Sequence, residues 1–419
     1  MILAIFGLAS ALLILLLTLF EPGLPYRLPE AVDIAPDSDE FVHLLAVVAD
    51  AHLYDDTVFE VLTNGDRFYA AELQAIRAAR TYICMEAYIF QKGEIADRFI
   101  EALAGRARAG IDVRLVLDAV GSFNTWPSTF RELIAAGGRV CWYNPLRWYN
   151  FARYNNRTHR EMLIVDGTTA FIGGAGVADH WYKSRNRKNR WRDTMVEVRG
   201  QAVDSLQAMF IENWLESSGE LLANCSYYPA RKANGSGRVM VVNSTPSCGR
   251  STRARMLVQI LLATARRRIH LTTPYFLPDR GVRRVLIDAL TRGVEVKILV
   301  PGKHSDHLLT RRSSRRLYGS LLRSGAEIYE YQPSMIHTKS LVVDGLWSVA
   351  GSTNFDSRSF GINDEVNVAA FDEGLAAHLD EDFHADLRVS RRITYEEWSR
   401  RPAIERANEW LGWLIERQQ

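Results

Sequence analysis

Two short stretches with the same pattern decide the fold: HREMLIVDG (159–167) and HTKSLVVDG (337–345). In each, a charged residue follows the histidine by two positions, and an apolar run leads to an Asp-Gly pair. Alternate side chains of a strand point to the same face, so each histidine shares a face with Glu161 or Lys339. The apolar runs predict buried strands, and the Asp-Gly pairs predict tight turns. Each stretch should therefore carry two polar groups to one place.

The sequence around these stretches also repeats. GIDVRLVLDAVG (110–121) matches RGVEVKILVPG (292–302), and FRELIAAGGRVCWYNP (130–145) matches YGSLLRSGAEIYEYQP (318–333). Strands that alternate with helices predict an α/β fold in which a mostly parallel sheet is flanked by helices. Two copies of this series predict a pseudo-twofold pair of domains. We expect the first domain at 46–232 and the second at 233–419.

The first half contains an insertion that the second half lacks. Pro145 and Pro333 are 188 residues apart, whereas the two histidines are 178 residues apart, so ten extra residues precede the first histidine. They lie within LRWYNFARYNNRT (146–158), which mixes aromatic residues with arginines. Two interpretations are open: an ordinary surface loop, or a membrane-facing lip at the mouth of the site.

The amino-terminal region predicts a membrane anchor. Residues 1–20 carry no charge, and a helix of that length, at about 1.5 Å per residue, reaches roughly 30 Å, the thickness of the hydrocarbon core. The absence of a basic segment and of a small-residue cleavage site favours an uncleaved transmembrane helix over a signal peptide. Residues 21–45 hold four prolines and several acidic residues and are expected to be a linker. The expected location is a cell membrane, the inner membrane of a bacterium, with a single pass.

Composition narrows the classes of partner only slightly. Apolar residues make up 47% of the chain and charged residues 24%, as in a globular protein with a sizeable core. The formal net charge is only +2, so no global charge indicates a polyanionic partner. The four cysteines lie far apart and show no zinc-binding spacing.

The second stretch, together with Ser352 and Asn354, resembles the H-x-K-x4-D and G-S-x-N signature of the HKD-type phospholipase D superfamily. Within that superfamily the chain is most similar to bacterial cardiolipin synthases. Four further stretches carry this resemblance: EAYIF (86–90), WRDT (191–194), TTPYFLP (272–278) and RSFGINDEVN (358–367). The resemblance covers nearly the whole chain after the predicted linker and implies two phospholipase D-like domains.

The resemblance also implies a mechanism through two histidines. One neutral imidazole attacks phosphorus and forms a phosphohistidine, while the other, protonated, donates to the leaving oxygen and later accepts a proton from the incoming hydroxyl. The family favours His159 as the nucleophile, but the more complete second motif favours His337, and the sequence leaves the choice open. The remaining implied residues are Asp193 and Glu365, which orient the histidines; Asp166 and Asp344 of the motifs; and Lys339, Ser352, Asn354 and Gly174, which bind the phosphate. No metal or other cofactor is implied.

The first half departs from the family at two positions. It has Glu161 where the signature has lysine, and Gly176 where it has asparagine. A carboxylate about 4 Å from a phosphate would cost several kcal/mol at an effective dielectric constant near 20. Glu161 should therefore be paired with Lys339 or an arginine, protonated, or turned away from the phosphate.

Two basic runs are candidates for contact with lipid. Residues 183–192 (KSRNRKNRWR) and 311–316 (RRSSRR) are either solvated faces or surfaces that attract anionic headgroups. Beside a membrane anchor and a phospholipid-type motif, the second interpretation is favoured.

The function expected from the resemblance is that of a cardiolipin synthase, which transfers a phosphatidyl group between two phosphatidylglycerol molecules and releases glycerol. A hydrolytic phospholipase D, a nuclease of the same superfamily and a non-catalytic lipid-binding protein are the alternatives. The expected partners are phosphatidylglycerol, other anionic phospholipids and the membrane, and no nucleic acid is expected. The sequence does not indicate an oligomeric state.

Overall fold

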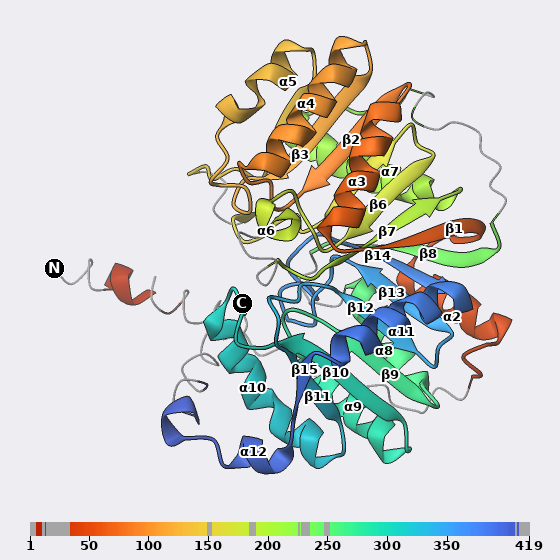
Figure 1. Cartoon of the computed structure of the whole chain (residues 1–419), viewed down its shortest axis with the longest axis vertical. Helices are drawn as coiled ribbons and strands as arrows, with labels where there is room; N and C mark the ends of the chain where they lie inside the picture. The colour runs from red at the N-terminus through yellow and green to blue at the C-terminus, as the bar shows by residue number, and fades with distance from the viewer. Residues whose placement is uncertain are drawn as a thin grey trace.

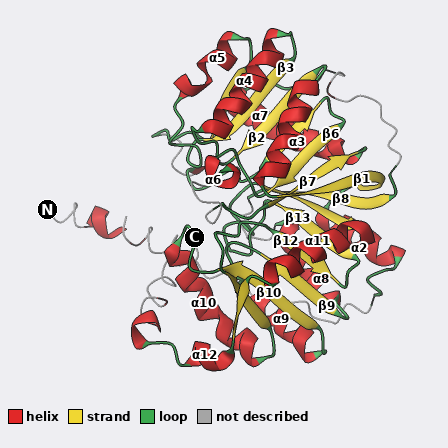
Figure 2. Cartoon of the chain, viewed as in Figure 1, coloured by secondary structure: helices red, strands yellow, loops and turns green. Residues whose placement is uncertain are grey.

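The computed structural model describes residues 6–10, 13, 34–148, 153–183, 190–224, 227, 235–246, 252–406 and 409. Figure 1 shows two halves, with the first half above and the second half below, joined where β1 and β8 lie side by side. Figure 2 shows that strands run through both halves and that helices flank them.

The first half contains the following elements in chain order: α2 (Asp39–Ala49), β1 (Leu53–Thr63), α3 (Gly65–Ala78), β2 (Tyr82–Ala87), α4 (Glu94–Arg108), β3 (Asp112–Asp118), the 3₁₀ helix η1 (Pro127–Phe130), α5 (Arg131–Ala135), β4 (Arg139–Tyr143), β5 (Met162–Val165), β6 (Thr169–Gly173), α6 (Asp179–Tyr182), β7 (Thr194–Arg199) and α7 (Ala202–Ser218).

The second half repeats most of this series and ends with an additional strand and helix: β8 (Gly237–Ser244), α8 (Arg253–Thr264), β9 (Arg268–Thr272), α9 (Arg280–Thr291), β10 (Glu295–Pro301), α10 (Leu308–Arg323), β11 (Glu327–Tyr331), β12 (Ser340–Val343), β13 (Trp347–Gly351), β14 (Glu365–Phe371), α11 (Glu373–Leu387), β15 (Ser390–Ile393) and α12 (Tyr395–Ser399).

Fifteen strands of the described chain form one continuous sheet. Their order is β15-β11-β10-β9-β12-β13-β14-β8-β1-β7-β6-β5-β2-β3-β4. Apart from β15, this order reads the same from both ends once the repeated strands are matched, so the predicted pseudo-twofold repeat is present. The antiparallel β1–β8 pair joins the two halves at the centre.

The prediction of a mostly parallel sheet is wrong. Only β2–β3–β4 and β9–β10–β11 are parallel neighbours, and every other neighbouring pair in the described sheet is antiparallel. The reason lies in the connections. The helices α4 and α5 cross over between β2, β3 and β4, and α9 and α10 cross over between β9, β10 and β11, as parallel pairing requires. Each histidine-bearing stretch instead leads into a hairpin, β5–β6 or β12–β13.

Helices cover both faces of the sheet. The helices α7 and α11 share one core with β5–β8 and β12–β14. On the other face, α3, α4 and α5 pack on the first half, while α2, α8, α9 and α10 pack on the second. The two predicted strands β5 and β12 are buried along their apolar residues, as their sequence indicated.

The helix α2 corrects the predicted linker, which was drawn to residue 45. Ser38 caps this helix by accepting a hydrogen bond from the amide of Phe41 at 3.1 Å. Phe41, Val42 and Leu45 lie on one helical face and are buried in the core of the second half. Helical spacing of these apolar residues outweighed the polar composition of the segment.

The predicted anchor falls mostly outside the described residues, which include only 6–10 and 13 of its length. In the parts of the chain that the structure describes, no helix has both the length and the apolar character needed to cross a bilayer.

Candidate active site

Each histidine is paired with a carboxylate from the opposite half. His337 Nδ1 lies 2.9 Å from Asp193 Oδ2, and His159 Nδ1 lies 3.0 Å from Glu365 Oε2. All four side chains are buried. Two separate stretches of sequence therefore become one constellation that neither half completes by itself.

The backbone also crosses between the halves at both histidines. The amide of His159 donates to the carbonyl of Asp364 at 2.9 Å, and the amide of His337 donates to the carbonyl of Arg192 at 2.7 Å. Because these residues directly precede Glu365 and Asp193 in sequence, the same bridge that holds each histidine also places its carboxylate.

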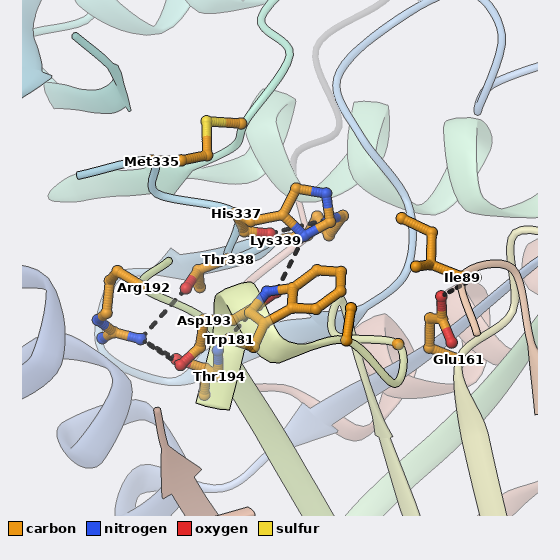
Figure 3. A network of polar contacts seen from close by, with 12 residues as sticks. Ile89, Glu161, Trp181, Arg192, Asp193, Thr194, Met335, His337, Thr338 and Lys339 are labelled. Carbon is orange, nitrogen blue, oxygen red and sulfur yellow. Dashed lines mark hydrogen bonds and ion pairs between the residues drawn. The ribbon is translucent and has the colours of Figure 1, made fainter. Parts of the chain in front are cut away.

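Lys339 lies directly against the ring of His337 (Figure 3). Its Nζ is 2.9 Å from Nδ1 and 3.0 Å from Nε2, and it donates to the His337 carbonyl at 2.8 Å. Burial lowers the pKa of Lys339 to about 8. Burial, followed by the nearby lysine charge, lowers the pKa of His337 despite its bond to Asp193.

Asp193 has hydrogen-bond partners besides the histidine that it orients. Besides His337, it accepts from the indole of Trp181 at 3.1 Å and from the amide of Thr194 at 2.8 Å. Burial by itself would raise its pKa, but the hydrogen bond and charge of His337, together with the charge of Lys339, lower it. Asp193 is therefore held as an anion that fixes the orientation of the ring.

Ser352, predicted to bind phosphate, contacts the carboxylate of Glu365. Its hydroxyl donates to Glu365 Oε2 and accepts from the amide of Val366 at 3.0 Å. With both roles of the hydroxyl in use, Ser352 positions the carboxylate of the first histidine. Asn354 is buried, and its Oδ1 has no hydrogen-bond partner among the described residues.

Gly174 corresponds to Ser352 in the first half, and its lack of a side chain makes room for the lysine. A Cβ at this position would lie 2.8 Å from Lys339 Nζ and 3.0 Å from Asp193 Oδ1. The glycine therefore leaves room for Lys339 of the second half to approach the first half.

Asp166 and Asp344, which the motif suggested for catalysis, lie at the other end of the histidine-bearing strands. Asp344 accepts from the amides of Arg266, Arg267 and Arg268 at 2.7–2.9 Å. Asp166 accepts from the corresponding amides at the start of β2, including that of Thr81 at 2.7 Å. Their distance along the strand and these backbone bonds make them structural clamps, and we correct the predicted role accordingly.

Glu161 is turned towards the backbone of its own half. Its Oε1 accepts from the amide of Ile89 at 3.1 Å (Figure 3). Burial raises its pKa well above the usual value, although the Ile89 amide and the charge of Lys339 act in the opposite direction. Of the three possibilities left by the sequence, the contact with Ile89 supports a carboxyl that faces the backbone, and its burial favours the protonated form.

Because Gly176 has no side chain, it leaves the space that the Glu161 carboxyl occupies. A Cβ at residue 176 would lie 2.8 Å from Glu161 Oε1 and would collide with the Ile89 carbonyl. The two departures from the signature thus occur together for a steric reason, since a larger residue at 176 would displace the carboxyl.

Several described arginines of the two basic runs are paired within the protein. Arg192 contacts Asp382 at 3.0 Å and Asp386 at 2.9 Å, and it is buried. Arg311 and Arg315 both contact the buried Glu330. These arginines are used in packing, which corrects the expectation that they attract headgroups; residues 184–189 lie outside the described chain.

Several aromatic residues of the site were not identified from the sequence. The ring of Tyr88 lies 5.1 Å from His159, and those of Trp181 and Tyr275 lie 5.4 and 6.4 Å from His337. Tyr88 and Tyr275 lie one position apart in the matched stretches EAYIF and TTPYFLP, and a tyrosine in both stretches is a signal that could have identified them. In the described part of the chain, no cluster of three or more His, Cys, Asp or Glu side chains could hold a metal ion.

Comparison with known proteins agrees with this geometry. A family model described as cardiolipin synthase, phospholipase D-like domain, matches residues 73–214 and 258–387. The chain is 32% identical over 383 residues to the major cardiolipin synthase ClsA of Bacillus subtilis, covering 90% of this chain and 79% of that protein. It is 32% identical over 381 residues to cardiolipin synthase 1 of Staphylococcus epidermidis, covering 90% and 77%.

Among solved structures, phosphatidylserine synthase of Haemophilus influenzae superposes with a TM-score of 0.69 over 91% of this chain and 100% of that one, at 13% identity. This likeness concerns the fold. The duplicated sheet and the two crossed carboxylate–histidine pairs define the class, a phospholipase D-like enzyme with one site built from two halves. Within that class, the chain belongs to the cardiolipin synthase family.

Proposed function

We propose that this phosphatidyltransferase of the cardiolipin synthase type joins two phosphatidylglycerol molecules into cardiolipin and releases glycerol. The observation that carries the proposal is the pair of buried histidines, each held by a carboxylate of the other half at 3.0 Å or less. This arrangement supplies one nucleophile and one proton donor on a single phosphodiester.

The reaction balances in two steps. In the first, Nε2 of one histidine bonds to phosphorus, the P–O bond to the headgroup glycerol breaks, and the second imidazolium gives its proton to that oxygen. In the second, the now neutral imidazole takes the proton from a hydroxyl of the other phosphatidylglycerol, whose oxygen bonds to phosphorus while the P–N bond breaks. The family resemblance favours His159 as the nucleophile and His337 as the acid and base.

Lys339 and Asn354 are the groups we assign to the phosphate. The lysine ammonium can offset the charge on the non-bridging oxygens, and the amide can donate to one of them. A bound phosphodiester would also offset the effect of Lys339 on His337, and so raise the pKa of that histidine towards the value that an acid requires.

We further propose that the chain works at a cell membrane, held by residues 1–20 as a single-pass anchor. The support is the uncharged composition and the length of this segment. Transfer must compete with attack by water, and a site held at a lipid surface meets acceptor hydroxyls at high local concentration.

Product analysis tests the proposed activity. The purified full chain in vesicles of phosphatidylglycerol should form cardiolipin and free glycerol in equal amounts, measured by lipid mass spectrometry and a glycerol assay. Phosphatidic acid as the main product would replace the proposal with the hydrolytic phospholipase D. Deletion of residues 1–20 should lower the rate on vesicles more than the rate on detergent-dispersed lipid, and equal losses would contradict the anchor.

A further inference from the structure

Two loops beside the first histidine expose large apolar side chains. Phe123 and Trp126 follow β3 and are 71% and 73% exposed, whereas Leu146 and Trp148 follow β4 and are 65% and 91% exposed. Because β3 and β4 are parallel neighbours, both loops follow the carboxyl-terminal ends of these strands and leave the sheet on the same side. We call these four residues the aromatic rim.

The loop that carries Phe123 and Trp126 is held in place by hydrogen bonds. Asp118 accepts from the amides of Val120 at 2.8 Å and Gly121 at 2.9 Å. The hydroxyl of Ser122 donates to the Tyr88 carbonyl at 2.9 Å, and that of Thr125 donates to the Phe90 carbonyl, and both hydroxyl-bearing residues are buried. The polar side chains of this loop thus point inward while its two aromatic rings point outward, the reverse of an ordinary soluble loop.

The same loop is in direct contact with the site. A Cβ at Gly121 would collide with the Tyr88 carbonyl and approach its ring, so the loop packs closely on Tyr88. The Tyr88 ring in turn lies 5.1 Å from that of His159. Asp118 also accepts from the amide of Thr158, the residue directly before the histidine, at 3.1 Å.

The loop with Leu146 and Trp148 belongs to the insertion found only in the first half. Asn144 ties its two ends by donating to the carbonyls of Arg153 at 2.6 Å and Asn156 at 2.8 Å. Arg147 and Arg153 are exposed on this closed loop, next to the apolar side chains. The rim therefore combines apolar rings with positive charge on one side of the site mouth.

This composition fits the surface of an anionic lipid bilayer. Exposed apolar surface of this kind is costly in water, and clustered instances mark interaction sites. Tryptophan rings favour the headgroup level of a bilayer, and arginines there are attracted to anionic lipid. A site that acts on phospholipids must also receive its substrate from such a surface.

We propose that the aromatic rim inserts into the interface of an anionic bilayer and sets the mouth of the first-half histidine against the lipid. This proposal rests on the proposed function, since it assigns the membrane contact of that same site. It is separate from the anchor, because the rim lies on the folded domain.

Hydrogen exchange on the full chain tests the rim without requiring activity. On addition of vesicles that contain phosphatidylglycerol, amides of residues 119–126 and 144–148 should become protected, while those of α2 should not change. An unchanged rate of exchange in both loops would contradict the proposed insertion of the aromatic rim, even if the enzyme makes cardiolipin. Protection that arises without lipid at higher protein concentration would assign the surface to a second copy and would also overturn it.

Matched variants provide a second test. For the double change Phe123→Ser and Trp126→Ser, the ratio of the rate on phosphatidylglycerol vesicles to the rate on monomeric short-chain phosphatidylglycerol should fall about tenfold. The control Val47→Ser removes a side chain that is 63% exposed on α2, and its ratio should stay at the wild-type value. Equal ratios in the rim variant and the control would refute the rim. A wild-type chain without activity on either substrate would instead refute the proposed function and leave hydrogen exchange to decide on the rim.

Discussion

Glu161 stands at the position that Lys339 occupies in the second half, yet it does not place a negative charge on the substrate. Its buried carboxyl accepts from the Ile89 amide and has a pKa raised well above the usual value by burial. We predict that Glu161→Gln retains activity within about tenfold, roughly 1.4 kcal/mol, because the amide keeps the shape and the acceptor of a neutral carboxyl. Steady-state rates on phosphatidylglycerol measure this, with Glu161→Ala as the control that removes the acceptor.

The opposite result for Glu161 would be informative. If the glutamine variant lost all activity while folding normally, the carboxyl would have to exchange a proton during the reaction. The neutral, structural role assigned from its contacts would then be wrong.

The lowered pKa of Lys339 predicts that the reaction slows at alkaline pH. Its pKa is lowered to about 8 by burial, so the ammonium loses its proton as the pH rises through that value. Because the charged form is the one that stabilises the phosphate, the contribution of Lys339 to kcat/KM should be present below pH 8 and should be lost above it. The measurement is a pH profile on monomeric substrate between pH 6 and 10, and a level profile up to pH 10 would show that the lysine charge is not needed.

The two histidines should behave as one unit. We predict that His159→Ala and His337→Ala each abolish turnover and that the double variant is little worse, because each removes a group that both steps require. Rates are to be compared with the circular dichroism and thermal midpoint of each variant, which should remain near wild type. Substantial turnover by the His159→Ala protein would mean that the second half acts without the first.

The hairpins that follow the histidine strands give a prediction at the level of the element. Asp344 has φ of 58° and Gly345 has φ of 71°, as a tight hairpin turn requires, and the Asp344 side chain accepts three consecutive amides at the start of β9. Asp344→Ala should lower the free energy of unfolding by about 2 to 4 kcal/mol, since it leaves these amides without their acceptor and places alanine in a left-handed conformation.

Denaturant unfolding measures this loss, and Asp344→Asn is the matched control because asparagine keeps one oxygen and tolerates positive φ. The rate per folded molecule should change little in either variant at low temperature. If Asp344→Ala stopped the chemistry and left stability unchanged, the aspartate would belong to the active site after all.

Local pattern predicted the elements well because the apolar runs and Asp-Gly pairs act over a few residues. The repeat, the buried strands β5 and β12 and the hairpins could all be read in this way. The direction of the strands could not be predicted in this way. Helices and strands alternate along much of the chain, but only three strands of each half pair in parallel in the described sheet. The helix α2 was missed in part because its apolar face finds its partner only in the second half.

For the site, the sequence named the residues but not all of their tasks. The family motif named Asp193 and Glu365 as the orienting carboxylates, and the structure adds that both carboxylate–histidine pairs cross between the halves. Ser352, Asp166 and Arg192 make contacts within the protein that the sequence did not indicate, for one common reason. A polar residue in a motif looks the same in sequence whether it faces a substrate, a backbone amide or another side chain.

At the scale of the whole molecule, the crossed pairs connect residues 206 and 144 positions apart in sequence. His159 is synthesised long before its partner Glu365, which lies in β14. A chain still emerging from the ribosome therefore carries no working site until that strand has been synthesised. Until β8 follows, β1 is also left as an open sheet edge that can pair with other chains. The one continuous sheet thus delays chemistry until β14 has been made, and the interval between β1 and β8 is the period in which a nascent chain is most exposed to misassembly.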